Sequence, residues 1–214
     1  MKNLHIAFIS NHEFNNDMAV VSSLLNNSTR QSVDNLLWSD NGYKPLVSFS
    51  MDYTEDNILL KYFVTEKYVK ADYHQINDPV YKDSCVEFFI AFGDDENYYN
   101  LEFNPVGTAL IGYGSDNNDR KMLSEIIISQ IKSQYSISVS PDDKGNTEWE
   151  LTLSIPFALF IHNAISSLVG QHCKANFFKC GDDLPVPHYL SWNPINHPQP
   201  NFHLPQFFGT IMFA

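Results

Sequence analysis

A formal net charge of −12 over 214 residues argues against a nucleic-acid-binding surface, because phosphate binding needs clustered Lys and Arg. A hydrophobic content of 43% is enough for a packed core and excludes wholesale disorder. No apolar run approaches the length of a membrane span, and the chain length suits a single domain over residues 1–214.

The N-terminal segment carries a short apolar patch from Leu4 to Ile9, which His5 interrupts. This patch is shorter than the hydrophobic region of a secretory signal. We therefore expect a cytoplasmic protein, unless a signal has already been removed.

The first part of the chain predicts strands separated by polar connections. Met18 to Leu25 fits a strand or a short helix, and residues 26–44 are interpreted as a loop that folds Trp38 onto the core. A hairpin follows, because apolar residues recur at every second position from Val47 to Tyr53 and again from Ile58 to Val64.

Residues 77–107 contain the most informative pair of predicted strands. Val86 to Phe92 and Tyr99 to Phe103 alternate with a period of two, which gives one apolar face and one mixed face. The mixed face carries carboxylates, amides and a ring, at Glu87, Tyr98, Asn100, Glu102 and Asn104. On an exposed β face these groups suit the binding of a sugar.

The second half of the chain adds further strands. They are expected at residues 108–113, 135–139, 149–155, 175–180 and 207–213. Met122 to Ile131 fits a helix by length, but the β-branched run Ile126 to Ile128 favours a strand. Residues 157–168 are the one expected helix here. About ten strands at short spacing predict an antiparallel sandwich or barrel.

Two groups of residues are candidates for catalysis. Glu87 and Glu102 lie on neighbouring predicted strands, close enough to serve as the two catalytic carboxylates of a glycosidase. The sequence contains no feature that would raise the pKa of either one. A hydrogen-bonded pair is the simpler interpretation. Four histidines gather in the last fifth of the chain, with spacings that match no zinc motif: His172, His188, His197 and His203. A small enzyme using the two glutamates or one of these histidines stays an alternative.

Acidic residues and cysteines are the candidate metal ligands of this sequence. A structural calcium ion is a candidate for the acids that flank the informative strands, Asp78, Asp83, Asp94, Asp95 and Glu96. A run such as Asp94 to Asn97 in a turn is more often simply solvated. The three cysteines, Cys85, Cys173 and Cys180, form no disulfide framework and no convincing zinc site, so we expect buried, reduced thiols.

Three segments together resemble one known family. Tyr81 to Ile90 is similar to the D-S-x-V-E-x-F-I strand of family 9 carbohydrate-binding modules and related DOMON-like sandwiches. Trp149 to Pro156, WELTLSIP, resembles the strand that leads into the short helix of that family. Ala175 to Gly209 resembles the closing series N-F-x-x-C, S-W-x-P and F-H-x-P-x-x-F-G. Over residues 45–214, the resemblance implies an all-β, antiparallel jelly-roll-like β-sandwich with one or two short helices and non-catalytic glycan binding.

The resemblance also implies where a sugar would bind. Two aromatic rings clamp a terminal sugar unit in that family, and the matching positions here are Tyr81 and Phe202. The strand carboxylate falls at Glu87, and a polar position on the next strand falls near Glu102. This chain departs from the pattern, because the clamp rings are usually Trp and the residue at the Glu102 position is often basic.

Our interpretation is a non-catalytic domain whose partner is a carbohydrate, with neither nucleic acid nor membrane as a partner. Rings would cover the apolar face of the sugar, and carboxylates and amides would accept from its hydroxyls. The expected site residues are Tyr81, Glu87, Glu102, Asn104, Trp192 and Phe202. A protein-interaction module, or a cofactor-binding module such as the DOMON-like domains that bind haem, is a further alternative. Apart from the candidate calcium ion, no cofactor is expected.

Overall fold

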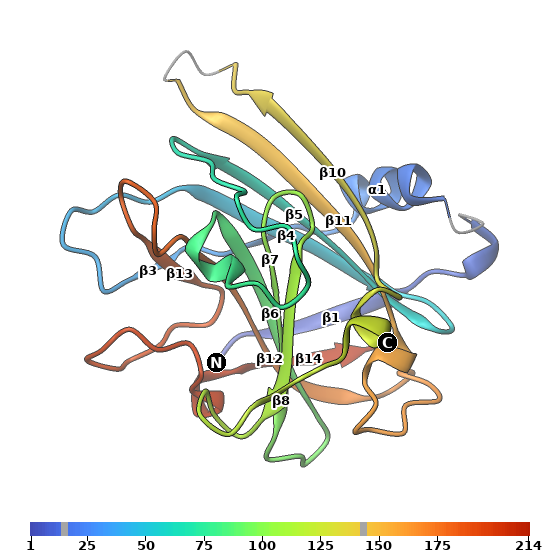
Figure 1. The fold of residues 1–214 in the computed structure, drawn as a ribbon. Coiled ribbons are helices and arrows are strands. Elements are labelled where there is room, and N and C mark those ends of the chain that lie inside the picture. The colour runs from blue at the N-terminus through green and yellow to red at the C-terminus, as the bar shows by residue number, and fades with distance from the viewer. Residues whose placement is uncertain (14–16, 142–144) are drawn as a thin grey trace.

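The computed structural model describes residues 1–13, 17–141 and 145–214. Within these residues, 14 strands form one continuous sheet that curls until its two halves face each other (Figure 1). Strand β1 (Asn3–Phe8) joins the halves, because it is hydrogen-bonded to β4 of one half and to β14 of the other. The predicted all-β sandwich is confirmed.

The strands divide between the two halves in a simple way. One half contains β10 (Lys132–Val139), β11 (Thr147–Pro156), β5 (Asn57–Glu66), β4 (Leu46–Tyr53) and β2 (Gln31–Ser32). The other half contains β14 (Gly209–Phe213), β12 (His172–Cys180), β6 (Cys85–Phe92), β7 (Tyr98–Phe103), β8 (Ala109–Gly114) and β9 (Lys121–Met122). Two short strands extend that half beside β12, namely β13 (Tyr189–Ser191) and β3 (Asn35–Leu37).

Both expected hairpins, β4–β5 and β6–β7, are present and antiparallel. Strand β1 adds a feature that the sequence pattern does not predict, since it runs parallel to both of its neighbours. Side chains alternate with the same period in parallel and antiparallel strands, so the direction of pairing leaves no trace in the alternation.

The longer helix, α1 (Met18–Asn27), packs on the outside of the sheet. Its start is fixed by Asp17, whose side chain accepts a hydrogen bond from the Ala19 backbone N–H at 2.8 Å. Val21 and Leu25, one turn apart, are fully buried in one cluster with Leu59 of β5. No helix in the described part of the chain is long and apolar enough to cross a membrane.

The prediction of a strand within residues 122–131 is wrong, because this segment contains the one-turn helix α2 (Glu125–Ile128). Only Ile128 of its isoleucines is buried, while Ile126 is 78% exposed. Burial on one side only suits a helical turn on the surface better than a strand within a sheet. The predicted helix over 157–168 is limited to a single 3-10 turn. The 3-10 turns among the described residues are η1 (Asn11–Glu13), η2 (Val80–Lys82), η3 (Phe157–Leu159) and η4 (Pro205–Phe207).

The main core lies between the two sheet halves and is dominated by aromatic rings. Phe49 of β4 stacks on Phe177 of β12 with ring centroids 3.7 Å apart. Trp192 meets both rings edge-on and is 0% exposed. A Cβ at Gly209 would lie 2.5 Å from the Trp192 ring and 2.8 Å from the Lys2 carbonyl oxygen, so only glycine fits there. The prediction of an exposed binding ring at Trp192 is therefore wrong, because the indole fills the core.

Candidate functional site

A cavity of about 290 Å³ lies over the face of β6, β7 and β12 that points away from the main core. Residues 181–208 fold back over this face, and the loop after β3 and the turn η2 complete the rim. The mixed face that we expected to be open to solvent is therefore buried. Polar side chains form the floor of the cavity, and aromatic rings form its wall.

Two carboxylates occupy the floor. Glu87 of β6 lies directly opposite Glu102 of β7 in the antiparallel register, and they are 3% and 2% exposed. Glu102 Oε1 accepts hydrogen bonds from Asn100 Nδ2 at 2.8 Å and from Arg120 Nη1 at 3.0 Å. Glu102 Oε2 is buried and finds no hydrogen-bond partner within the described residues. This oxygen is thus a buried acceptor that the described residues leave without a donor.

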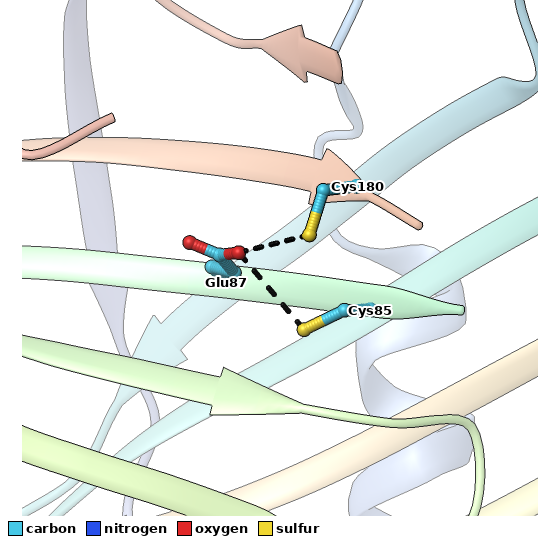
Figure 2. A group of neighbouring side chains, drawn as sticks. All are labelled: Cys85, Glu87 and Cys180. Carbon is cyan, nitrogen blue, oxygen red and sulfur yellow. Dashed lines mark hydrogen bonds between the residues drawn. The ribbon is translucent and has the colours of Figure 1, made fainter. Parts of the chain in front are cut away.

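The environment of Glu87 is less polar. Its Oε1 accepts a hydrogen bond from the Cys180 thiol at 3.1 Å and lies 4.0 Å from Cys85 Sγ (Figure 2). Burial, and secondarily the neighbouring Glu102, raises the pKa of Glu87 well above its usual value. Burial also raises the pKa of Glu102, although Arg120 opposes this effect. No feature of the sequence alone indicates a raised pKa, whereas burial beneath residues 181–208 explains it.

Arg120, just before β9, is the cation of the site, and its side chain is 17% exposed. Besides Glu102, its Nη1 lies 3.4 Å from His203 Nε2. Burial and Arg120 lower the pKa of His203 to about 3, so the ring is neutral and Nε2 accepts from the guanidinium. Nδ1–H is then free to donate to the Tyr98 hydroxyl, 2.8 Å away. This network holds Arg120 and His203 in fixed orientations at the edge of the cavity.

The wall contains rings from three separate parts of the chain. Phe202 stacks on Phe178 of β12 with centroids 4.3 Å apart and stays 9% exposed. Trp38 lies 5.9 Å from Phe202 and 5.9 Å from Tyr189 of β13. Tyr81 of η2 also lines the cavity. The wall thus combines the two predicted clamp rings with two that the sequence did not single out as ligands.

Trp38 is held in an unusual backbone conformation. Its φ is +47°, which is rare for a residue other than glycine and costs free energy that its surroundings must offset. The indole Nε1 donates to the His197 carbonyl oxygen at 2.7 Å. This hydrogen bond holds the ring where it packs against the cluster of Phe178 and Phe202, so the prediction that Trp38 folds onto the core is correct. The ring also lines the cavity, which the sequence did not predict.

Four of the six predicted site residues line this cavity: Tyr81, Glu87, Glu102 and Phe202. Trp192 does not, as described above. The prediction that Asn104 binds the ligand is wrong as well, because this residue is fully buried away from the cavity. Its Nδ2 donates to Asp83 Oδ2 at 3.1 Å and to the Tyr73 carbonyl oxygen at 2.8 Å, so it holds a loop.

The predicted calcium ligands do not converge. Asp83 accepts from the Tyr73 backbone N–H, Asp78 from the backbone of residues 74–75, and Asp95 from the Tyr113 hydroxyl. Each of these acids is committed to a different local network. In the described ranges, the only side chains that come together as a metal-binding group are Cys85, Glu87 and Cys180.

Comparison with known proteins gives the family. The model of carbohydrate-binding family 9 matches residues 19–213. The chain belongs to this family. A crystal structure from Bacteroides uniformis, of a protein designated as carbohydrate-binding, has a TM-score of 0.88 and 36% sequence identity, covering 100% of this chain and 99% of that one.

Two structures of a family 9 module from Caldicellulosiruptor kristjanssonii share the fold at low identity. The complex with glucose has a TM-score of 0.58 and 13% identity, covering 100% of this chain and 96% of that one. The complex with cellotriose has a TM-score of 0.58 and 12% identity, covering 99% and 93%. A comparison with curated proteins found no match.

Proposed function

We propose that this family 9 domain binds a carbohydrate without transforming it, and that one sugar unit enters the cavity between the ring wall and the carboxylate floor. The observation that carries the proposal is the pairing of these two surfaces in one cavity. Trp38 and Phe202 lie on one side, and the carboxyl groups of Glu87 and Glu102 lie on the other.

A pyranose matches both surfaces. Its C–H face packs against aromatic rings, and its hydroxyls donate to carboxylate oxygens and accept from a guanidinium. Glu102 and Arg120, held together at 3.0 Å, offer acceptor and donor groups side by side. Adjacent sugar hydroxyls, each both donor and acceptor, can use the two groups together.

The size of the cavity favours a short ligand. At about 290 Å³ it lies at the lower end of the range for ligand pockets, about 300–1,000 Å³. This volume suits the end of a saccharide better than a long internal stretch. Affinity is expected to be modest, because a small contact area must offset the cost of ordering the sugar.

The proposal is tested by titrating the protein with glucose, cellotriose and a panel of other saccharides, using calorimetry or ligand-observed NMR. Phe202→Ala should abolish the binding that the wild type shows. Tyr135→Ala is the matched control, because Tyr135 lies on β10, outside the cavity, and is 51% exposed. Silence of the wild type across a glycan array, or full binding by a folded Phe202→Ala protein, would contradict the proposal.

A small glycan-active enzyme is the second candidate, and one observation favours it. Burial raises the pKa of both carboxyl groups, but it raises that of Glu87 further, because Glu102 is ion-paired with Arg120. Such a difference between two carboxylates is how glycosidases divide acid and base roles. Turnover of a chromogenic glycoside that is lost in Glu87→Gln would replace the binding proposal with this one.

A further inference from the structure

Two thiols and a carboxylate meet at the base of the cavity. Cys85 is the direct partner of Cys180 in the antiparallel register of β6 and β12. Glu87 follows Cys85 by two positions, so its side chain points to the same face of the sheet. Figure 2 shows the three side chains converging from the two strands. Regular strand geometry therefore brings the three groups together, without a contribution from any loop.

The separations of the donor atoms are those of a small metal site. Glu87 Oε1 lies 3.1 Å from Cys180 Sγ and 4.0 Å from Cys85 Sγ, and all three atoms lie within 4.8 Å of one another. Zinc–sulfur bonds of about 2.3 Å and tetrahedral angles place neighbouring ligand atoms about 3.5 to 3.8 Å apart. Small side-chain rotations would bring the three atoms to these separations.

The chemical character of the ligands selects the class of ion. Thiolates favour soft or borderline cations such as Zn²⁺, whereas Ca²⁺ and Mg²⁺ prefer sites made of oxygen atoms. Cys85, Glu87 and Cys180 are 0%, 3% and 2% exposed, respectively. Burial raises the pKa of the Cys85 thiol to about 12 and raises that of Cys180 as well. A bound cation would offset this burial by stabilising the deprotonated ligands, and its binding would release their protons.

We propose that Cys85, Cys180 and Glu87 bind one divalent cation of the zinc class at the floor of the cavity. Three protein ligands leave the fourth position of a tetrahedral ion to a water molecule or a ligand. Glu87 and Cys180 line the cavity whereas Cys85 lies behind them, so the fourth position faces the cavity. If the proposed function is correct, a sugar hydroxyl can occupy that position, and the ion is then part of sugar recognition.

The test is a titration of the reduced, metal-free protein with cobalt(II) chloride, followed by displacement with zinc chloride. We expect one equivalent of Co²⁺ to bind, with a thiolate charge-transfer band in the near ultraviolet and the visible bands of tetrahedral Co²⁺. Cys180→Ser should halve the charge-transfer band and weaken Co²⁺ binding at least tenfold. Glu87→Gln, which preserves the side-chain volume, should keep the band and weaken binding.

Cys173→Ser is the matched control, because Cys173 is equally buried near the other end of β12 but lies outside the cluster, so its spectrum should equal that of the wild type. Near-ultraviolet circular dichroism of each variant checks the fold. The proposal is overturned if the reduced wild type binds no Co²⁺, or if the folded Cys85→Ser and Cys180→Ser proteins keep the full band. A purified protein with a Cys85–Cys180 disulfide that takes up no metal after reduction also overturns it. These readouts need no sugar, so they fail or succeed independently of glycan binding.

Discussion

The two faces of β6 and β12 are both buried, yet they bury different chemistry. On the inner face, Phe88 and Phe177 pack against the opposite half of the sheet in an apolar core. On the outer face, Glu87 and Cys180 lie beside Phe89, beneath residues 181–208. A buried carboxylate costs stability unless it is paired, so the outer face stabilises the fold less than the apolar part of the inner face does. The inner face also buries charge, at its end, where Lys179 pairs with Glu66. Burial alone therefore does not define a core. The outer face, where buried polar groups cost folding free energy, is the face on which to look for function.

The strongest test of this comparison is Trp192→Ala on the inner face. Removing a fully buried indole should lower the free energy of unfolding by about 3–5 kcal/mol, measured by urea denaturation. Saccharide binding by the remaining folded protein should be unchanged, because the indole lies outside the cavity. Loss of binding without loss of stability would place Trp192 in the site instead.

The matching change on the cavity side is Trp38→Ala. Because the ring lines the cavity and is only partly buried, we expect saccharide binding to weaken about 30-fold, or about 2 kcal/mol, with a smaller change in stability than for Trp192→Ala. Calorimetry and urea denaturation of the same preparation separate the two effects. A variant that loses stability but binds normally would show that Trp38 belongs to the core.

On the floor of the cavity, Glu102→Gln should weaken saccharide binding about 10-fold, or about 1.4 kcal/mol. The substitution removes the negative charge beside Arg120 and turns one acceptor oxygen into a donor. Calorimetric titration gives the comparison with the wild type. Glu125→Gln, at the exposed start of α2, serves as the control for the charge change. Equal affinity for both variants would mean that Glu102 makes no contact with the ligand.

Much of this architecture was predictable because strands leave a period of two in the sequence. The alternation over 86–92 correctly separated the core side of β6 from the side that carries Glu87. The closeness of Glu87 and Glu102 followed from the prediction that their strands are neighbours in a hairpin. Tyr81 and Phe202 came from the family resemblance, since neither lies in a strand.

The rest of the site comes from irregular segments, where no periodicity indicates the direction of a side chain. Trp192 was expected at a ligand and fills the core, whereas Trp38 packs onto a core cluster as expected and also lines the cavity, which was not expected. Arg120 was not predicted as a site residue, although an arginine in a chain of net charge −12 is a candidate for pairing with a functional carboxylate. Its partner Glu102 lies two strands away from β9, and only the folded sheet brings them together.

The smallest expected effect concerns the end of the inner face, where Lys179 pairs with Glu66 at 3.0 Å and His188 Nε2 accepts from Lys179 Nζ at 2.8 Å. Burial and Lys179 lower the pKa of His188 to about 3 from the usual 6.5. Below pH 6.5 the unfolded chain therefore binds a proton that the folded protein does not. The contribution of His188 to the free energy of unfolding is therefore fully present above pH 6.5 and decreases as the pH falls toward 3.

Between pH 7 and pH 5.5, the wild type should thus lose about 1 kcal/mol more unfolding free energy than His188→Gln. Urea denaturation of both proteins at the two pH values gives the difference. Carboxyl groups with raised pKa values, such as Glu87, act in the opposite direction but contribute to both proteins, so they cancel. An equal pH dependence for the two proteins would mean that His188 takes up its proton in the folded state. The charge cluster at the end of the inner face would then be open to water, and the contrast between the two faces would be weaker than their burial suggests.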